Sequence, residues 1–243
     1  MTEHSQDLVR NRLLAALPPK SFARLRPFLE PVDLPVRQVL TEPDRPTTHA
    51  YFLESGLGSV VATSPHGEAV EVGHVGPDGV SGFHVFLGTD QTPNYTAMQT
   101  DGSGLRIAVP QLLAVVAEDA MMRDFFLRYV HCCQIQLASS ALANARYTMH
   151  ERLARWLLMC HDRLEGDDLP LTHEFLALML GVRRSGVTNE LHVIEGLGAI
   201  RSTRGNVRIL DRGRLQEMAR GSYGVAEREY ERLMGVSLRL QYA

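Results

Sequence analysis

The sequence predicts an α+β fold, because three patterns follow one another along its 243 residues. From about residue 32 to 109, apolar and polar side chains alternate, as they do in antiparallel strands. A long helical stretch follows, and the rest of the chain carries short helical segments and one hairpin signal. We therefore expect an antiparallel β-roll at 1–118, a long helix at 119–146 and a small helical domain with a β-hairpin at 147–243.

The first 30 residues predict two short helices in front of the roll. Apolar side chains recur at spacings of three and four between residues 7 and 30, and Pro18 and Pro19 interrupt them.

Seven short alternating segments predict the strands of the roll. Turn signals rich in glycine, proline and aspartate separate them at nearly regular spacing, which is typical of a cupin-like jelly roll. The expected strands are 34–36, 51–53, 60–62, 70–72, 80–86, 95–97 and 105–107.

A short helix at 111–117 and then one long helix to residue 146 are expected after the roll. In the long helix Phe126, Val130, Cys133 and Leu137 recur at a 4-3-4 spacing, which is typical of a seam between two helices. The alternative is a helix that packs on its own roll. We favour the seam, and therefore a homodimer, because a helix of this length is unusual in a small domain.

A new helix is expected to begin after Thr148 and to run to about Leu164. Thr148 and Glu151 have the spacing of a capping box, in which the hydroxyl and the carboxylate accept free backbone N–H groups. This cap sets the expected boundary of the C-terminal domain near residue 147.

Residues 171–194 have the pattern of a helix-turn-helix. Thr172 can cap the first helix, Gly181 can end it in the left-handed conformation, and Val182 can fill the angle between the helices. The second helix then presents side chains that can bond to base edges or phosphates of duplex DNA. These are Arg184, Ser185, Thr188 and Asn189.

The helix-turn-helix is followed by a predicted wing, which is a hairpin with its turn at 204–206. Arg201, Arg204 and Arg208 lie on this hairpin, and we expect them to contact phosphates together with Arg183 and Thr188. We expect Arg184, Ser185 and Asn189 to read bases.

The charge distribution supports a polyanionic partner for this part of the chain. The whole sequence has a net charge of −3, but residues 183–214 hold seven arginines against three acids. One basic face is therefore expected on an otherwise acidic protein. Such a cluster taken alone is more often a solvated surface.

Composition indicates a water-exposed globular protein without a membrane partner. Hydrophobic residues make up 44% of the chain, but no stretch approaches the roughly 18 apolar residues of a membrane span. The N-terminus also lacks a cationic run followed by an apolar one. We expect a cytoplasmic protein.

The order of these elements resembles the Crp/Fnr superfamily over about residues 20–218. The segments that carry the resemblance are 180–188, 198–200 and 204–211, together with the turn at 51–56. The resemblance implies a transcriptional regulator rather than an enzyme. It also implies that the chain binds pseudo-palindromic DNA as a homodimer and contacts RNA polymerase.

The sequence departs from the family in two groups of cofactor-binding residues. Relatives that bind cyclic AMP hold it with an acid and an arginine, but the corresponding stretches here are 82–84 and 95–97, which contain neither. Relatives with an iron–sulfur cluster use N-terminal cysteines, and none precedes Cys132. We expect neither cofactor. Cys132, Cys133 and Cys160 are expected to be reduced, buried thiols, with a redox role for the adjacent pair as the alternative.

The sequence does not decide whether the roll holds an effector pocket. Phe83, His84, Tyr95 and Thr96 would line it, although aromatic residues in strands are more often core. Haem bound by His74 or His84 is also left open. One alternative function is a small-ligand or haem sensor that acts mainly through protein contacts. Another is a cupin-like enzyme, which would need a His/Glu metal site that the sequence lacks.

Overall fold

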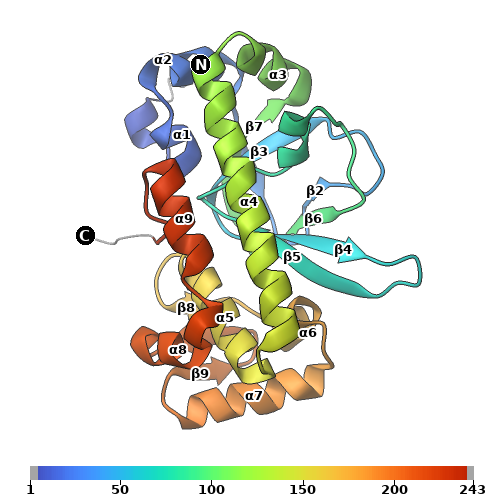
Figure 1. The fold of residues 1–243 in the computed structure, drawn as a ribbon, viewed down its shortest axis with the longest axis vertical. Coiled ribbons are helices and arrows are strands. Elements are labelled where there is room, and N and C mark those ends of the chain that lie inside the picture. Colours follow the sequence, from blue (N-terminus) through green and yellow to red (C-terminus); the bar gives the residue numbers. More distant parts are fainter. Residues whose placement is uncertain (1–4, 240–243) are drawn as a thin grey trace.

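Strand-forming and helix-forming segments keep the predicted order in the computed structural model, which describes residues 5–239 (Figure 1). A β-roll forms one end of the molecule and a small helical domain the other. The long helix α4 runs between them along one side. The predicted α+β fold is therefore confirmed.

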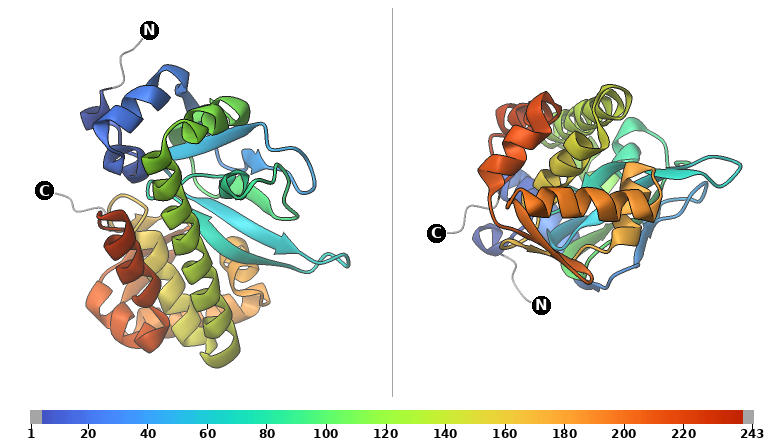
Figure 2. Two further views of the ribbon diagram at one scale, coloured as in Figure 1. Left: turned by 45° about the horizontal axis from the view of Figure 1, so that its top comes forward. Right: turned by 90° about the horizontal axis from the view of Figure 1, so that it is seen from below.

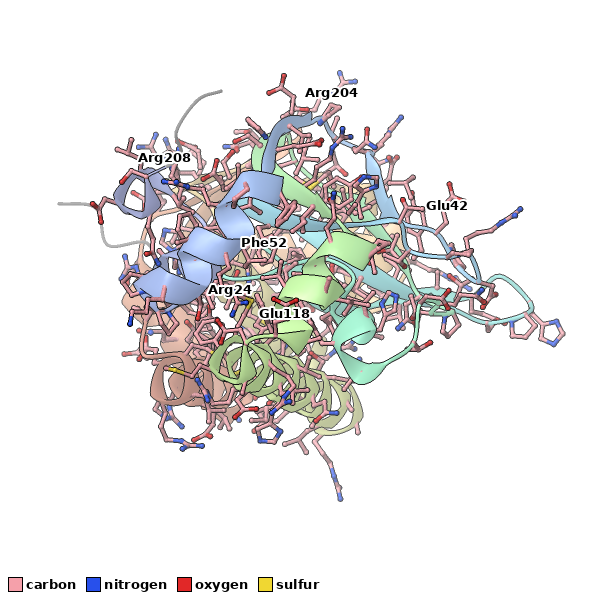
Figure 3. The ribbon with its side chains drawn as sticks, turned by 90° about the horizontal axis from the view of Figure 1, so that it is seen from above. Arg24, Glu42, Phe52, Glu118, Arg204 and Arg208 are labelled. Atoms are coloured by element: carbon pink, nitrogen blue, oxygen red, sulfur yellow. The ribbon has the colours of Figure 1, made fainter. Side chains whose placement is uncertain are left out.

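Two short helices precede the roll, as the sequence predicts. Helix α1 (Arg12–Ala16) begins at Asn11, whose side chain accepts the N–H of Leu14. Helix α2 (Pro19–Leu25) starts with a proline in its first turn. Backbone N–H groups have no acceptor within the helix at this position, so the N–H that proline lacks costs no hydrogen bond. The 3₁₀ turns η1 (Gln6–Leu8) and η2 (Arg26–Phe28) flank this pair. Arg24 of α2 faces Glu118, which directly follows helix α3 (Val109–Ala117) (Figure 3).

The roll consists of two antiparallel sheets, with strand orders β1-β7-β3 and β2-β6-β4-β5. Apolar side chains such as Phe52 and Leu105 are fully buried between the sheets and the helices. The strands are β1 (Glu30–Leu34), β2 (Val39–Thr41), β3 (His49–Ser55), β4 (Gly58–Thr63), β5 (Ala69–Val75), β6 (Tyr95–Met98) and β7 (Gly102–Ala108). The strand expected at 34–36 lies mostly in the turn between β1 and β2.

The strand predicted at 80–86 is wrong, because this segment forms a turn and the 3₁₀ helix η3 (Phe83–Leu87). Val80 makes a single bridge to Phe52, and Gly82 then takes a positive φ of 70° that ends the extended conformation. Phe86 stacks on Phe126 of α4, with ring centroids 4.5 Å apart. The apolar residues of this segment are therefore explained by packing on a helix.

Two helices follow the roll at the predicted places. Helix α3 (Val109–Ala117) is followed by α4 (Ala120–Arg146), which begins at Asp119, whose carboxylate accepts the N–H of Met122. None of the helices within residues 5–239 is both long and apolar enough to cross a membrane.

The seam predicted on α4 is wrong for two of its four residues. Phe126 and Val130 are 0% and 3% exposed, and Phe126 packs in the chain's own core. Cys133 is half-buried, and only Leu137 is exposed, at 48%. For Phe126 the alternative of a helix packed on its own roll is correct. Dimerisation through α4 stays a prediction, but it needs a different face.

The C-terminal part begins with the predicted capping box, which Thr148 and Glu151 form at the start of α5 (Met149–His161). This helix ends three residues earlier than the Leu164 that the sequence predicts. The further elements are β8 (Asp168–Leu169), α6 (His173–Leu180), α7 (Arg184–Gly196), β9 (Ile200–Thr203), β10 (Asn206–Ile209), α8 (Arg212–Ala219), η4 (Arg220–Ser222) and α9 (Val225–Met234).

The last helix leaves the C-terminal domain and returns along α4 (Figures 1 and 2). Tyr230, Met234 and Leu238 are buried in the same core as the N-terminal helices and the roll. Arg12 of α1 donates to the carbonyls of Ser237 and Leu238. The final segment is thus part of the N-terminal core, which the sequence pattern did not indicate.

A buried ion pair joins the roll to the C-terminal domain. The Nη2 of Arg163 lies 2.9 Å from the Oδ2 of Asp78, and the two side chains are only 3% and 6% exposed. Burial alone would lower the pKa of Arg163, but the carboxylates of Asp78 and Asp162 raise it above its usual value. Asp78 lies in the turn after β5, whereas Arg163 follows α5.

Other parts of the chain bond to the same turn. The hydroxyl of Tyr230 on α9 donates to the carbonyl of Asp78, at 2.7 Å. The side chain of Asn11 donates to the carbonyl of Gly79, at 2.8 Å. A Cβ on Gly79 would lie 2.4 Å from the hydroxyl of Tyr129, so glycine alone permits this close approach.

We expect the change Asp78→Ala to lower the free energy of unfolding by roughly 3–5 kcal/mol, because it leaves the guanidinium of Arg163 buried without its partner. Urea denaturation followed by circular dichroism measures this loss. The control is Arg208→Ala, which removes a solvent-exposed ion pair and should cost less than about 1 kcal/mol. Similar losses for the two variants would contradict the structural importance of the Asp78–Arg163 pair.

Candidate nucleic-acid interface

The helix-turn-helix forms through the local interactions that the sequence predicts. The hydroxyl of Thr172 accepts the N–H of Phe175 at the start of α6. Gly181 ends this helix with a φ of 62°, and the N–H of Val182 bonds to the carbonyl of Ala177. Helix α7 begins two residues later, at Arg184.

The apolar sides of α6 and α7 are buried together, so that the opposite side of α7 faces solvent. The buried residues are Leu176, Ala177, Leu180, Val187, Leu191 and Ile194. Arg183, Arg184, Ser185 and Asn189 are exposed, whereas Thr188 is half-buried. In the view from below, α7 lies across the end of the molecule with nothing in front of it (Figure 2).

Arg184 forms an ion pair with Glu174 of α6, with 3.0 Å between Nη1 and Oε1. Glu190 and Glu195, the two acids of α7 itself, have other partners. Glu190 lies 3.3 Å from His150, and Glu195 accepts the N–H of Ser202. The side chains of Arg184 and Glu174 are 65% and 75% exposed, so this pair contributes little to stability and can exchange for another acceptor.

A histidine that the sequence analysis did not assign to the interface connects the two helices to the wing. His173 Nδ1 lies 3.0 Å from the hydroxyl of Thr188 on α7, and its Nε2 lies 3.5 Å from the hydroxyl of Ser202 on β9. The Thr188 hydroxyl also donates to the carbonyl of Arg184. The hydroxyl of Thr188 is therefore engaged within the protein.

The wing places two arginines beside each other on one face. Arg201 of β9 and Arg208 of β10 are direct cross-strand partners, and both are exposed. Like charges in this position are destabilising. Asp168, on the opposite neighbour strand β8, lies 3.8 Å from Arg208. Arg204 lies at the exposed hairpin tip, next to Gly205 with a φ of 76°. The three arginines form a basic edge beside α7.

A cavity of about 100 Å³ lies between strands β4 and β5 and helix α4. Its wall is mostly apolar and includes Val60, Val72, Phe83 and Leu137. The polar residues of the wall are Asn94, Gln134, Gln136, His74, Tyr129 and Cys133. No Asp, Glu, Lys or Arg side chain lines it.

Only one of the four residues predicted for an effector pocket lines this cavity, namely Phe83. His84 instead bonds to Thr47, with 3.0 Å between Nε2 and Oγ1, and burial lowers its pKa. Tyr95 and Thr96 lie in β6 away from the cavity, and Thr96 is buried. The error arises because the 80–86 segment is a turn and not a strand, which changes the direction of His84.

The histidines considered for haem do not fit that cofactor. His74 Nε2 lies 3.0 Å from Glu71 Oε1, and its Nδ1 lies 3.4 Å from the amide of Gln136. His84 is bonded to Thr47 and to the backbone of Asp90. Within residues 5–239, no group of three His, Cys, Asp or Glu residues could hold a metal ion.

The three cysteines are free thiols. Burial raises the pKa of Cys132 to about 11 and that of Cys133 to about 12, and it also raises the pKa of Cys160. All three are therefore protonated near neutral pH, which makes them poor nucleophiles and argues against a redox role for the adjacent pair.

Comparisons with known proteins agree with this geometry. Residues 151–218 match the family model of the Crp-like helix-turn-helix domain. No curated protein sequence matches the chain.

Three solved structures share the fold at low sequence identity. A Crp/Fnr-family transcriptional regulator from Eubacterium rectale is 17% identical, with a TM-score of 0.67 over 86% of this chain and 98% of that one. FixK2 from Bradyrhizobium japonicum is 16% identical, with a TM-score of 0.70 over 79% and 98%. The c-di-GMP responsive regulator CLP from Xanthomonas campestris is 17% identical, with a TM-score of 0.65 over 79% and 99%.

We expect the protein not to bind cyclic AMP or cyclic GMP, because no arginine or lysine lines the cavity to pair with a buried phosphate. Isothermal titration calorimetry with either nucleotide should show no binding at physiological concentrations. Saturable binding in the micromolar range would contradict this expectation.

Proposed function

The chain has the fold of Crp/Fnr-type transcriptional regulators and carries their helix-turn-helix domain, and from this premise we propose that it binds a pseudo-palindromic operator as a homodimer. The observation that carries the proposal is the outer side of α7. Arg184, Ser185 and Asn189 are exposed there, and the buried core does not need them. The basic edge of the wing lies beside them. RNA polymerase is a further partner that the family resemblance implies.

The polar residues of this surface divide into two roles. Arg184, Ser185 and Asn189 lie on the first turns of α7, where a recognition helix meets base edges in the major groove. We expect the residues at the edge of this surface to contact phosphates. They are Arg183, Thr188, Arg201, Arg204 and Arg208. Thr188 is the weakest of these, because its hydroxyl already interacts with His173.

The dimer interface that we propose lies on the exposed face of α4. Six of the exposed residues of α4 recur at a 4-3-4-3-4 spacing, which is typical of a two-helix seam. Three of the six are alanines, which let two helices approach closely. They are Leu127, His131, Gln134, Ala138, Ala141 and Ala145. Two-fold symmetry would then place two copies of α7 about one turn of DNA apart.

A second function, ligand sensing, is favoured by the cavity beside α4. The cavity has a volume of about 100 Å³ and opens to solvent beside Leu137, which is 48% exposed. No Asp, Glu, Lys or Arg side chain lines it. We therefore propose that it takes a small, uncharged and largely apolar molecule. The alternative, in which the C-terminal domain acts mainly through protein contacts, predicts no operator binding.

The change Arg184→Ala should weaken binding to the preferred operator by about 1–3 kcal/mol per half-site and binding to random DNA only slightly. The guanidinium can bond to O6 and N7 of guanine together, and this interaction is removed on the specific sequence alone. Footprinting of the gene's own upstream region defines the operator, and fluorescence-anisotropy titrations give the affinities.

The change Arg204→Ala should weaken specific and random DNA about equally. It should also lower the slope of log affinity against log salt by roughly one for each phosphate that a subunit no longer neutralises. Arg24→Ala is the matched control, because Arg24 pairs with Glu118 in the N-terminal part of the fold. Equal losses on both kinds of DNA for Arg184→Ala would contradict its role in base recognition.

The double change Ala138→Glu and Ala141→Glu should convert the dimer to monomers at micromolar concentration, because it places unpaired carboxylates in the seam. Light scattering after gel filtration measures the mass. Met121→Glu is the control, since Met121 is 66% exposed but lies outside the 4-3-4-3-4 positions. Val130→Glu is no substitute, because Val130 is buried and its replacement would unfold the protomer. A double variant that remains dimeric would exclude this face as the interface.

A further inference from the structure

The chain continues beyond its helix-turn-helix domain, and this continuation packs on the other part of the molecule. The match to the Crp-like domain ends at residue 218, whereas helix α9 begins at Val225. Within the part of the chain that the structure describes, the apolar core of the C-terminal domain includes no residue after Tyr223. Helix α9 instead runs back along α4 (Figure 1). Residues 225–238, which we call the strap, are therefore an addition that this domain does not need for its own core.

One side of the strap is apolar and the other is polar. Every fourth side chain is buried, which gives the segment a single apolar stripe. The stripe consists of Ala226, Tyr230, Met234 and Leu238. On the opposite side, Arg228 and Glu231 are exposed. The strap therefore packs on the N-terminal core as an amphipathic helix packs on a partner.

Polar contacts hold the strap at the point where the two parts of the chain meet. The hydroxyl of Tyr230 donates to the carbonyl of Asp78, and Arg12 of α1 bonds to two carbonyls at the far end of the strap. Glu227 attracts the buried guanidinium of Arg163. These residues of the strap line one small cavity, of about 20 Å³, together with Asp78 and Arg163. The strap thus covers the ion pair that joins the roll to the C-terminal domain.

The chain is fixed against the junction of α4 and α5 just before the strap begins. Arg155 of α5 donates to the carbonyl of Ser222, at 2.9 Å, and to the hydroxyl of Ser140 on α4, at 3.2 Å. Arg220 has a φ of 49° and a ψ of −137°, a strained conformation for a residue with a side chain. Such strain persists only where surrounding contacts impose it, so release of the strap would relieve it.

We propose that residues 225–238 are a releasable strap that holds the C-terminal domain on the N-terminal core, and that their release lets this domain turn about the junction of α4 and α5. The docked strap leaves Arg184, Ser185 and Asn189 of α7 exposed, so it does not compete with DNA. It favours binding, because a domain that turns freely presents the arrangement that suits the operator for only a fraction of the time. This effect on DNA rests on the proposed function, whereas the docking of the strap does not.

A cysteine beneath the strap reports its release. Cys132 of α4 is buried and lines the same small cavity as Tyr230 and Leu238. Burial raises the pKa of its thiol to about 11, so that the thiol is protonated and unreactive while the strap is docked. Cys160 is buried in the core of the C-terminal domain and reports unfolding of that domain. Cys133 is partly exposed and is replaced by alanine in every protein that is compared.

The first experiment labels the full-length protein with dithionitrobenzoate. Met234→Glu should increase the labelling rate of Cys132 by at least about tenfold, because a carboxylate is costly to bury in the apolar stripe and the open form is populated more often. Cys160 should remain unlabelled. Val225→Glu is the matched control, since it adds the same charge to the same helix at a position that is 50% exposed, and it should leave the rate unchanged. An unchanged rate for Met234→Glu would overturn the inference.

A milder variant tests the strap if Met234→Glu does not fold. Tyr230→Phe keeps the ring but removes the hydrogen bond to the carbonyl of Asp78. The labelling rate of Cys132 should then rise between about twofold and tenfold, as the loss of one hydrogen bond predicts. If Cys160 is labelled as fast as Cys132, the whole chain unfolds rather than the strap, and the inference is wrong.

The second experiment measures operator affinity by fluorescence anisotropy. Met234→Glu should weaken binding by at least about fivefold, which is the lower end of typical coupling between sites, and Val225→Glu should not. Unchanged or tighter binding by a variant with a reactive Cys132 would refute the role of the strap in orienting the domain. A chain that bound no operator in any form would refute the proposed function, while the labelling of Cys132 would still decide whether the strap is released.

Discussion

The ion pair between Asp78 and Arg163 is the interaction on which the arrangement of the two parts of the chain depends. Both side chains are almost fully buried, so neither charge can regain water while the roll and α5 stay together. The carbonyl of Asp78 also accepts the hydroxyl of Tyr230 from α9. One turn of the roll therefore holds both the end of α5, which is the first helix of the C-terminal domain, and α9, which is the last helix of the chain. The glycine at position 79 lets Tyr129 approach this turn closely enough to bond to the N–H of Val80.

Helix α4 has three different environments around its axis, and each has a separate consequence. One side packs on the roll through Phe126, and another packs against α9. The remaining side is exposed and carries small residues that include Ala138 and Ala141. Apolar periodicity identifies a buried stripe, but it does not tell whether the stripe meets another copy or the same chain. For this reason the spacing of Phe126 and Val130 predicts a seam on the wrong side of the helix.

The candidate DNA surface and the cavity differ in how far the sequence could predict them. The surface on α7 depends on local signals, namely the Thr172 cap, the Gly181 terminus and the spacing of the apolar residues. The cavity depends on where β5 and α4 meet, and the residues that line it range from Val60 to Leu137 along the chain. Of the predicted pocket residues only Phe83 lines this cavity, since the predicted position of His84 depended on a strand that is a turn.

The sequence by itself determined most of the secondary structure, the order of the elements and the exposed polar residues of α7, because caps, glycine turns and periodicity act within a few residues. Tertiary structure alone decided the pairing of Asp78 with Arg163, the position of α9 and the contact of Glu71 with Trp156. Both side-chain pairs join residues 85 positions apart, and nothing in the local pattern of either partner specifies the other. The physical reason is that a buried charge or indole N–H needs some partner, and only the packing of the whole chain determines which one it meets.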